Sequence, residues 1–157
     1  MTTQRKFETG PFLTAAFFCE KLLQEVDGVK SAIRIVDRVV MQAEGPQPPN
    51  EMPKFNLPLN LFLQFKSGSV RGPLQLEVRM VKPSVDTKTI ISRTVSFEGE
   101  DDRGTDIACL MNLTVDQSGI YWFYVYLDDS IVTRIPLRII YLKQIRQVPP
   151  AGGTGTR

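Results

Sequence analysis

The chain has 157 residues, of which 42% are hydrophobic, and its 19 basic and 17 acidic residues leave a net charge of +2. This length and composition are typical of one globular domain with its own core. The charges are well mixed along the chain, so the sequence lacks the basic cluster of nucleic-acid-binding proteins, and we expect no specific nucleic-acid binding.

Histidine is absent from the sequence. Its absence excludes Ser-His-Asp and Cys-His catalysis and removes the side chain best suited to proton transfer at neutral pH. It also removes the commonest transition-metal ligand. No other catalytic constellation is recognisable, so the sequence predicts a protein that is not an enzyme and uses neither a cofactor nor a metal.

Residues 1–11 are polar, end in Gly10-Pro11 and are expected to form a leader ahead of the domain. The N-terminus lacks the apolar run of a secretory signal, and no segment approaches the length of a membrane span. We therefore expect a cytoplasmic protein with no membrane association. In that compartment the sequon Asn112-Leu113-Thr114 is interpreted as a chance match.

Residues 12–26 are the most ambiguous segment. Phe12, Ala16, Phe17, Glu20 and Leu23 could line a helix, whereas Phe17-Phe18-Cys19 suits a buried strand, and we predict a strand. Asp27-Gly28 is typical of a two-residue hairpin turn. Beyond it, Ile33, Ile35 and Val39 recur at odd positions and predict a second strand.

Residues 44–58 contain five prolines, too many for a central strand. We predict a long crossing loop, in part extended as polyproline, within one domain. An interdomain linker is the less favoured interpretation, because the segment before it is too short to fold alone.

Alternating apolar residues predict four further strands, over 59–66, 74–80, 89–97 and 107–115. Lys66–Gly72 contains glycine and basic residues without the spacing of a phosphate-binding loop, and it predicts a hairpin turn. Glu98–Asp106 predicts an exposed acidic loop. Its carboxylates could bind calcium, but their spacing is not that of an EF-hand, and a solvated loop is favoured.

The turn signal Asp116–Gly119 leads into a strand with five aromatic residues, and a β-branched run follows over 131–142. The two runs predict a long antiparallel hairpin. Its apolar faces meet only if Leu127 lies opposite Ile131 and Val125 lies opposite Thr133. Asp128-Asp129-Ser130 is then a three-residue loop, and its aspartates serve the turn rather than catalysis. Pro136 indicates that the second strand is an edge strand or is locally bulged.

This register predicts two faces for the first strand of the hairpin. Tyr121, Phe123, Val125 and Leu127 face inward, whereas Ile120, Trp122, Tyr124 and Tyr126 face outward beside Arg134 and Arg138. Trp, Tyr and Arg are the residues enriched in binding hot spots, so Trp122, Tyr124, Tyr126, Arg134 and Arg138 are the candidate binding site. Alternatively, the two arginines cover the rings within one molecule, or another segment covers the row.

The segment Asp116-Gln117-Ser118-Gly119-Ile120-Tyr121 resembles the turn before strand F of immunoglobulin-like domains. The resemblance implies that Tyr121 is a structural tyrosine corner. Gln117 replaces the usual aspartate, and Phe123 stands where antibody domains have a cysteine, so no immunoglobulin-type disulfide is expected there. Cys19 and Cys109 lie in apolar runs typical of buried free cysteines, although a disulfide between them stays open.

The order of motifs is also similar to that of a family of short bacterial cytoplasmic proteins of unknown function. The resemblance covers roughly residues 13–142 and implies a sandwich fold and a bacterial origin, without catalytic residues. It is carried by Ala16–Glu20, Asp27-Gly28, Ser31–Asp37, Gly119–Phe123 and Arg134–Leu137.

Together these patterns predict a single immunoglobulin-like antiparallel β-sandwich of about seven to nine strands over residues 12–146. A disordered tail is predicted over 147–157. The leading functional hypothesis is a non-catalytic protein-binding or assembly module, whose partner is another protein and which can also form homo-oligomers. A small-ligand or carbohydrate-binding sandwich that uses surface aromatics is the alternative, and an enzyme based on carboxylates is a weaker third.

Overall fold

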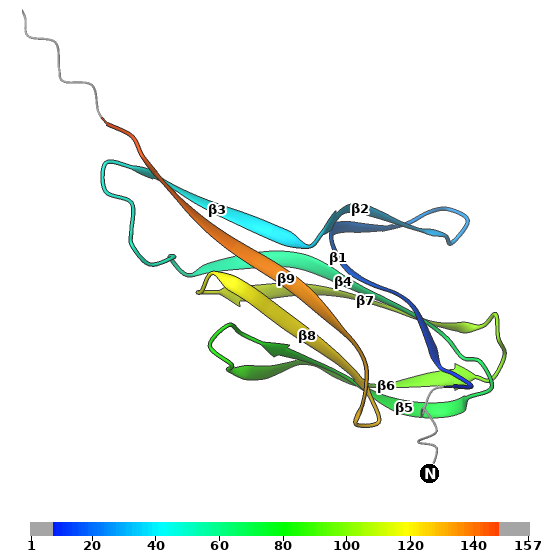
Figure 1. Cartoon of the computed structure of the whole chain (residues 1–157). Helices are drawn as coiled ribbons and strands as arrows, with labels where there is room; N and C mark the ends of the chain where they lie inside the picture. The colour runs from blue at the N-terminus through cyan, green and yellow to red at the C-terminus, as the bar shows by residue number, and fades with distance from the viewer. Residues whose placement is uncertain (1–7, 148–157) are drawn as a thin grey trace, which may run out of the picture.

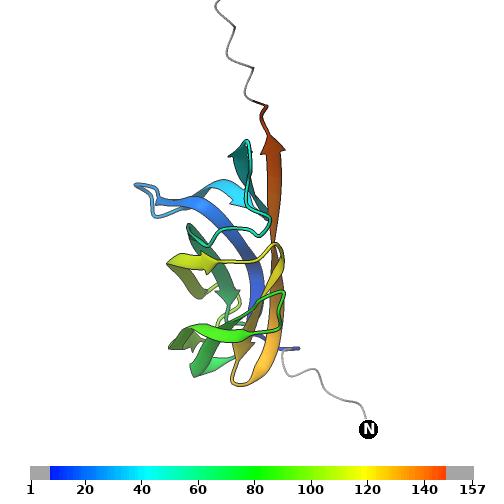
Figure 2. The same cartoon turned by 90° about the vertical axis from the view of Figure 1, so that its left-hand side faces the viewer.

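The computed structural model describes residues 8–147, and these fold into nine β-strands without a helix. The strands form two sheets that pack face to face (Figure 1 and Figure 2), which confirms the predicted all-β sandwich. Most of the predicted leader and of the predicted disordered tail lies outside the described residues. The strands are β1 (Phe12–Gln24), β2 (Lys30–Val36), β3 (Arg38–Gly45), β4 (Phe55–Lys66), β5 (Arg71–Val81), β6 (Thr87–Glu98), β7 (Gly104–Val115), β8 (Gly119–Leu127) and β9 (Ser130–Ile145).

The core lies between a four-stranded sheet, in the order β2-β1-β4-β7, and a five-stranded sheet, in the order β3-β9-β8-β5-β6. Alternate residues of each strand face it, because successive side chains of a strand point to opposite sides. The rings of Phe18 in β1 and Phe123 in β8 meet edge to face, with centroids 4.7 Å apart, and join the two sheets. Both side chains are buried, and each contributes about 1.5–3 kcal/mol by leaving water.

Asp37 divides the segment after the first hairpin into two strands that belong to different sheets, where the sequence predicted one strand. β2 pairs with β1, whereas β3 pairs in parallel with β9. The amide of Arg138 donates to the carbonyl of Asp37 over 2.9 Å and fixes the crossing. Even-numbered residues face the core before the crossing and odd-numbered residues face it afterwards. Val36 and Val39 therefore both pack against the core.

Ile33 and Ile35 were predicted to share an apolar face with Val39, and this prediction is wrong. They are 43% and 64% exposed, because β2 is an edge strand whose odd-numbered residues face outward. The turn before β2 is also longer than predicted. It spans residues 25–29, with Gly28 at φ +85° and the amide of Val29 donating to the carboxylate of Asp27.

The segment between β3 and β4 spans residues 46–54 and is shorter at both ends than the predicted loop over 44–58. Pro58 lies inside β4, contrary to the expectation that the prolines exclude a central strand. β1 pairs with β4 only over Asn60–Lys66, whereas at Pro58 β4 pairs with β7 alone. One side of β4 is therefore free at this position, and a missing N–H donor is tolerated there.

The segment after β4 crosses from one sheet to the other and is not the predicted hairpin turn, because β4 and β5 lie in different sheets. Ser67 is fully buried in this crossing. Its amide donates to the carbonyl of Arg103 over 2.7 Å, and its hydroxyl accepts from the amide of Glu98 over 3.2 Å. These bonds satisfy the polar groups that a buried crossing would otherwise leave without partners.

The predicted pairing along the β8–β9 hairpin is confirmed over most of its length. Trp122 lies opposite Pro136, Tyr124 opposite Arg134, and Val125 opposite Thr133. Tyr121, Phe123, Val125 and Leu127 are all buried, as their parity predicted. β9 itself lies between β3 and β8, but β3 begins only opposite Arg138, so β9 is locally an edge at Pro136.

The hairpin loop differs from the prediction. Leu127 pairs with Ser130, so the loop contains only Asp128 and Asp129, which have φ values of +42° and +63°. A β-bulge beside Val125 and Tyr126 adds one residue to β9 and restores the predicted register further on. Ile131 therefore lies before the bulge, opposite Tyr126, and is 55% exposed rather than part of the apolar face.

Cys19 in β1 and Cys109 in β7 are free thiols. Both strands flank β4, where Leu61 lies between Phe18 and Cys109. Two strand spacings separate the cysteine-bearing strands by about 9–10 Å, which is too far for a disulfide.

The acidic loop before β7 is held by ion pairs. Arg103 pairs with Glu98 and Glu100, and Lys30 of β2 pairs with Asp106. Glu98 ends β6 and Asp106 lies in β7, so the loop is shorter at both ends than the predicted Glu98–Asp106. Among residues 8–147, no group of three potential ligands is placed to hold a metal ion. The same residues include no helix with the length and apolarity needed to span a membrane.

Candidate functional site

Three aromatic rings point away from the core on the outer face of the five-stranded sheet. Trp122, Tyr124 and Tyr126 occupy alternate positions of β8 and are all partly exposed. We call them the aromatic row. The buried residues between them fix the backbone of β8 in the core, so the row is presented on a rigid strand rather than on a loop.

Arginines from the two neighbouring strands cover part of the row. The guanidinium of Arg134 in β9 lies 4.6 Å from the ring centroid of Trp122. The guanidinium of Arg79 in β5 lies 4.3 Å from the ring centroid of Tyr126. Each contact is a cation–π interaction, in which the positive group meets the negative face of a ring.

Glu77 holds Arg79 in place. Its carboxylate accepts from Nη2 over 2.6 Å and from Nε over 2.9 Å, and this pairing raises the pKa of the guanidinium. Arg79 was not predicted as a site residue, because β5 is remote from the hairpin in sequence. Only the pairing of β5 with β8 places Arg79 opposite Tyr124.

Arg134 and Arg138 were both expected beside the row, and both lie on β9 next to β8. Arg134 is opposite Tyr124, but its guanidinium lies over Trp122. Arg138 is opposite Ile120 on one side and Arg38 of β3 on the other, and it contacts no ring among the described residues. Arg38 is itself paired with Asp37, 3.1 Å away.

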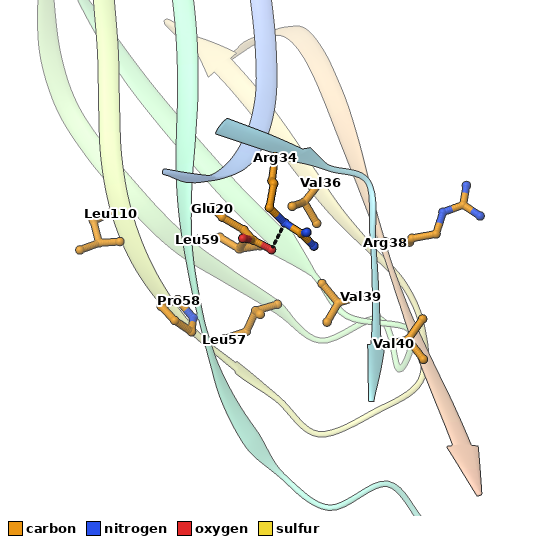
Figure 3. A pocket seen from close by; sticks show the side chains of 10 residues that line it. All are labelled: Glu20, Arg34, Val36, Arg38, Val39, Val40, Leu57, Pro58, Leu59 and Leu110. Atoms are coloured by element: carbon orange, nitrogen blue, oxygen red, sulfur yellow. Dashed lines mark ion pairs between the residues drawn. The ribbon is translucent and has the colours of Figure 1, made fainter. Parts of the chain in front are cut away.

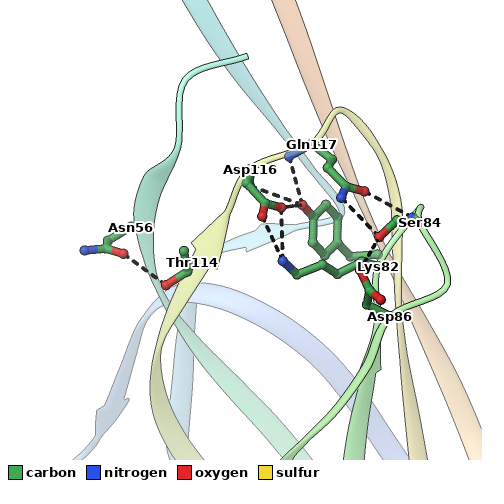
Figure 4. A network of polar contacts seen from close by, with 8 residues as sticks. Asn56, Lys82, Ser84, Asp86, Thr114, Asp116 and Gln117 are labelled. Carbon is green, nitrogen blue, oxygen red and sulfur yellow. Dashed lines mark hydrogen bonds and ion pairs between the residues drawn. The ribbon is translucent and has the colours of Figure 1, made fainter. Parts of the chain in front are cut away.

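The hydroxyl of Tyr121 lies at the start of the hairpin and accepts from the amides of Asp116 and Gln117, over 3.4 and 3.2 Å. It also donates to the carboxylate of Asp116 over 3.3 Å. This return of the hydroxyl to the backbone just upstream is the contact made by a tyrosine corner. An ion pair links the corner to the end of β5, because Lys82, the residue after this strand, pairs with Asp116 over 2.9 Å (Figure 4).

The charges of this corner match a structural role. Burial raises the pKa of Tyr121, and the ion pair raises the pKa of Lys82 and lowers that of Asp116. Each shift favours the form that the side chain already has at neutral pH. A general acid or base needs the opposite shift, which brings its pKa closer to neutral pH.

A groove with a volume of about 710 Å³ opens between β2, β3 and the free side of β4 (Figure 3). Its walls include Val36, Val39, Leu57 and Leu59. Arg34 points into it and pairs with Glu20, with Nε 2.8 Å from the carboxylate. No sequence pattern indicated this groove, because it forms where β1 leaves β4 and the chain crosses to β3.

Comparison with sequence families matches residues 14–140 to a family described as a family of unknown function (DUF6941). The match spans β1 to β9 and includes the aromatic row, the corner and the groove. A comparison with curated proteins finds no match.

Proposed function

The chain belongs to the DUF6941 family, whose function is unknown, and we propose that it is a non-catalytic protein-binding or assembly module. The outer face of the five-stranded sheet is its docking surface. The partner is another protein, which contacts the aromatic row together with Arg134 and Arg138.

The observation that carries this proposal is the aromatic row on a rigid strand with arginines on both sides. Trp, Tyr and Arg are the residues that most often dominate the binding energy of protein interfaces. Their side chains here are positioned before any partner arrives, since Arg79 and Arg134 already lie over rings. Such preorganisation lowers the entropy lost on binding.

Affinity capture with matched surface variants tests the proposal. Tyr124→Ala and Arg134→Ala each remove part of the docking surface, whereas Ile35→Ala removes a 64% exposed side chain from the other sheet, outside the groove. We expect a captured protein that both docking-surface variants lose by at least tenfold and that Ile35→Ala retains. If every captured protein is retained equally by all three variants, the proposed docking surface is wrong.

We also propose that the sandwich is immunoglobulin-like. In this assignment β4 and β7 correspond to strands B and E, and β5, β8 and β9 correspond to strands C, F and G. The order of the strands in the two sheets and the hydrogen bond of the Tyr121 hydroxyl at the corner support this assignment. An experimental structure with β5 away from β8, or with β4 away from β7, would contradict it.

A small-ligand-binding protein is the second candidate, and the groove favours it. Its volume lies within the usual range for ligand pockets, and its walls are mostly apolar. The surface aromatics are less suited to stacking on a sugar, because Arg79 and Arg134 occupy ring faces. A thermal-shift titration with decanoate tests the groove: stabilisation that Leu57→Trp abolishes supports it, and identical curves for both proteins contradict it.

A further inference from the structure

We propose that the partner presents an extended acidic segment to β9, with two carboxylates four residues apart and an apolar residue midway between them. This inference rests on the proposed function, because the segment occupies the same docking surface. It assigns the chemistry of the partner, which the proposed function leaves open.

The balance of charge on this face favours an acidic partner. Arg79 is neutralised by Glu77 over 2.6 Å, and Arg38 is neutralised by Asp37 over 3.1 Å. Arg134 and Arg138 have no ion pair with any residue in the described part of the chain. Two positive charges therefore remain available to an acidic partner, and complementary charge favours such a partner over others.

The two arginines without an ion pair among the described residues occupy regularly spaced positions along β9. Arg134, Pro136 and Arg138 share one side of β9, since they occupy alternate positions of the strand. At about 3.3 Å per residue, the Cα atoms of the two arginines are about 13 Å apart along the strand, and the guanidinium of Arg134 reaches from its position over Trp122. Pro136 lies between them, opposite Trp122. Along β9 this face therefore presents an arginine, a proline and a second arginine at two-residue intervals.

An extended chain matches this repeat directly. In such a chain, residues i, i+2 and i+4 point the same way, so an acidic, an apolar and a second acidic residue can meet Arg138, Pro136 and Arg134 together. A helix rises only 1.5 Å per residue and needs about nine residues to cover the same 13 Å. The two-residue repeat therefore favours the extended form.

Arg134 can bind a carboxylate while its guanidinium stays on the ring of Trp122. A guanidinium can stack on an aromatic face through its plane while its N–H groups donate at the edge. Single-stranded nucleic acid fits this face less well. It needs free ring faces for base stacking and many cations for phosphates, whereas Arg79 and Arg134 cover rings, and Arg79 and Arg38 are already paired with carboxylates.

Trp122 is the only tryptophan of the chain and provides a direct reporter of binding. Its fluorescence is titrated at low salt with a serine-rich eleven-residue peptide that carries two glutamates four residues apart and a valine midway. The control peptide has the same composition with adjacent glutamates. We expect saturable binding of the spaced peptide, at least fivefold weaker binding of the control peptide, and a further loss as salt is raised.

Three variants complete the test. Arg138→Gln is expected to lose the binding, and Arg138→Glu is expected to recover it with a peptide whose matching glutamate is replaced by lysine. Arg93→Gln makes the same change in charge on β6, opposite the inward-facing Leu76 and away from the outer face, and is expected to bind normally. Arg138 is exposed, so its loss is not expected to unfold the protein.

The remaining outcomes separate this inference from the proposed function. Equal binding of the two peptides overturns the spacing, and tighter binding of a decathymidine probe overturns the assignment to a protein segment. If the spaced peptide does not bind but a captured protein depends on Tyr124 and Arg134, only the inference of an acidic segment is overturned. Failure of both the peptide and the capture overturns the docking surface itself.

Discussion

At the scale of single residues, the Tyr121 hydroxyl links the chain before β8 to β8 itself. The ring is 1% exposed, and its hydroxyl accepts two backbone amides and donates to Asp116. Tyr124, three residues further along β8, is partly exposed and its hydroxyl has no partner among the described residues. The two tyrosines therefore form a matched pair, in which only one hydroxyl has a structural role.

Tyr121→Phe is expected to lower the free energy of unfolding by about 1–3 kcal/mol, because two partly buried amides lose their acceptor. Tyr124→Phe, the matched control, is expected to change it by less than about 0.5 kcal/mol. Urea denaturation followed by the fluorescence of Trp122 measures both. Equal effects of the two substitutions would show that the corner does not stabilise the fold.

The ion pair between Lys82 and Asp116 predicts a dependence of stability on pH. The pKa of Asp116 is lowered from 3.8, so its contribution is present above that value and is lost as pH falls through the lowered pKa. The pKa of Lys82 is raised from 10.5, so its contribution is present below 10.5 and is lost as pH rises through the raised pKa. The pair therefore stabilises the fold between these limits.

Asp116→Asn removes one partner of this ion pair. We expect the loss in unfolding free energy relative to the natural sequence to be clear at pH 7 and to shrink as pH falls below about 3.8. Asp101→Asn, in the exposed loop before β7, serves as the control and is expected to have little effect at either pH. A loss that grows toward acid pH would contradict the assignment.

At the scale of elements, the β8–β9 hairpin depends on a turn that aspartate fits poorly. Asp128 and Asp129 both have positive φ, the conformation of a type I′ turn, in which glycine is preferred at the second position. Asp129 is exposed. Asp128 has a further role, because its carboxylate accepts the amide of Gln75 over 2.8 Å.

Asp129→Gly is therefore expected to raise the free energy of unfolding by about 0.5–1 kcal/mol, because glycine adopts positive φ without the clash of a Cβ atom. Asp129→Ala keeps that clash and removes the tolerance of aspartate for this conformation, so it is expected to destabilise. Thermal and urea unfolding measure the order of the three proteins. If alanine is at least as stable as glycine at this position, the turn is not of this type.

The period of a strand explains which parts of the hairpin the sequence predicted. Phe123 and Val125 are both buried. They had to face inward because a one-residue slip of the hairpin would turn Arg134 and Arg138 toward the core. The bulge beside Val125 has no comparable signature, because a single extra residue changes no pattern of composition. The two-residue loop was missed for that reason, and Ile131 was placed on the wrong face.

Contacts between distant strands limited the prediction of the candidate site in the same way. Arg134 and Arg138 were found because β9 follows β8 directly. Arg79 was not found, because the neighbour of β8 on its other side is β5, and no local pattern specifies that pairing. The groove was missed because the crossing at Asp37 joins two strands that look continuous in sequence.

At the scale of the whole molecule, the two sheets depend on packing rather than on a covalent link. Phe18 and Phe123 meet edge to face across the core, with ring centroids 4.7 Å apart. Both cysteines remain reduced in the four-stranded sheet. Stability should therefore be insensitive to reducing agents and sensitive to the volume of the side chain at position 123.

Phe123→Ala is expected to lower the free energy of unfolding by about 3–5 kcal/mol, because it leaves a cavity between the sheets. Leu110→Ala, at a 72% exposed position, is expected to change it by less than about 0.5 kcal/mol. If Phe123→Ala does not fold, Phe123→Leu gives the same test with a smaller cavity. A difference of less than 1 kcal/mol between the Phe123 variant and Leu110→Ala would contradict the role of Phe123 in joining the sheets.

The parallel pairing of β3 with β9 has a consequence for the order in which the molecule forms. Each residue of β3 meets a partner one hundred positions later, from Arg38 with Arg138 to Gly45 with Ile145. At a synthesis rate of about 5–20 residues per second, β3 waits roughly 5–20 seconds before its partner is made. During that interval the remaining strands can pair without β3. The crossing at Asp37 is therefore expected to close last, and the groove beside it is a product of the final step of folding.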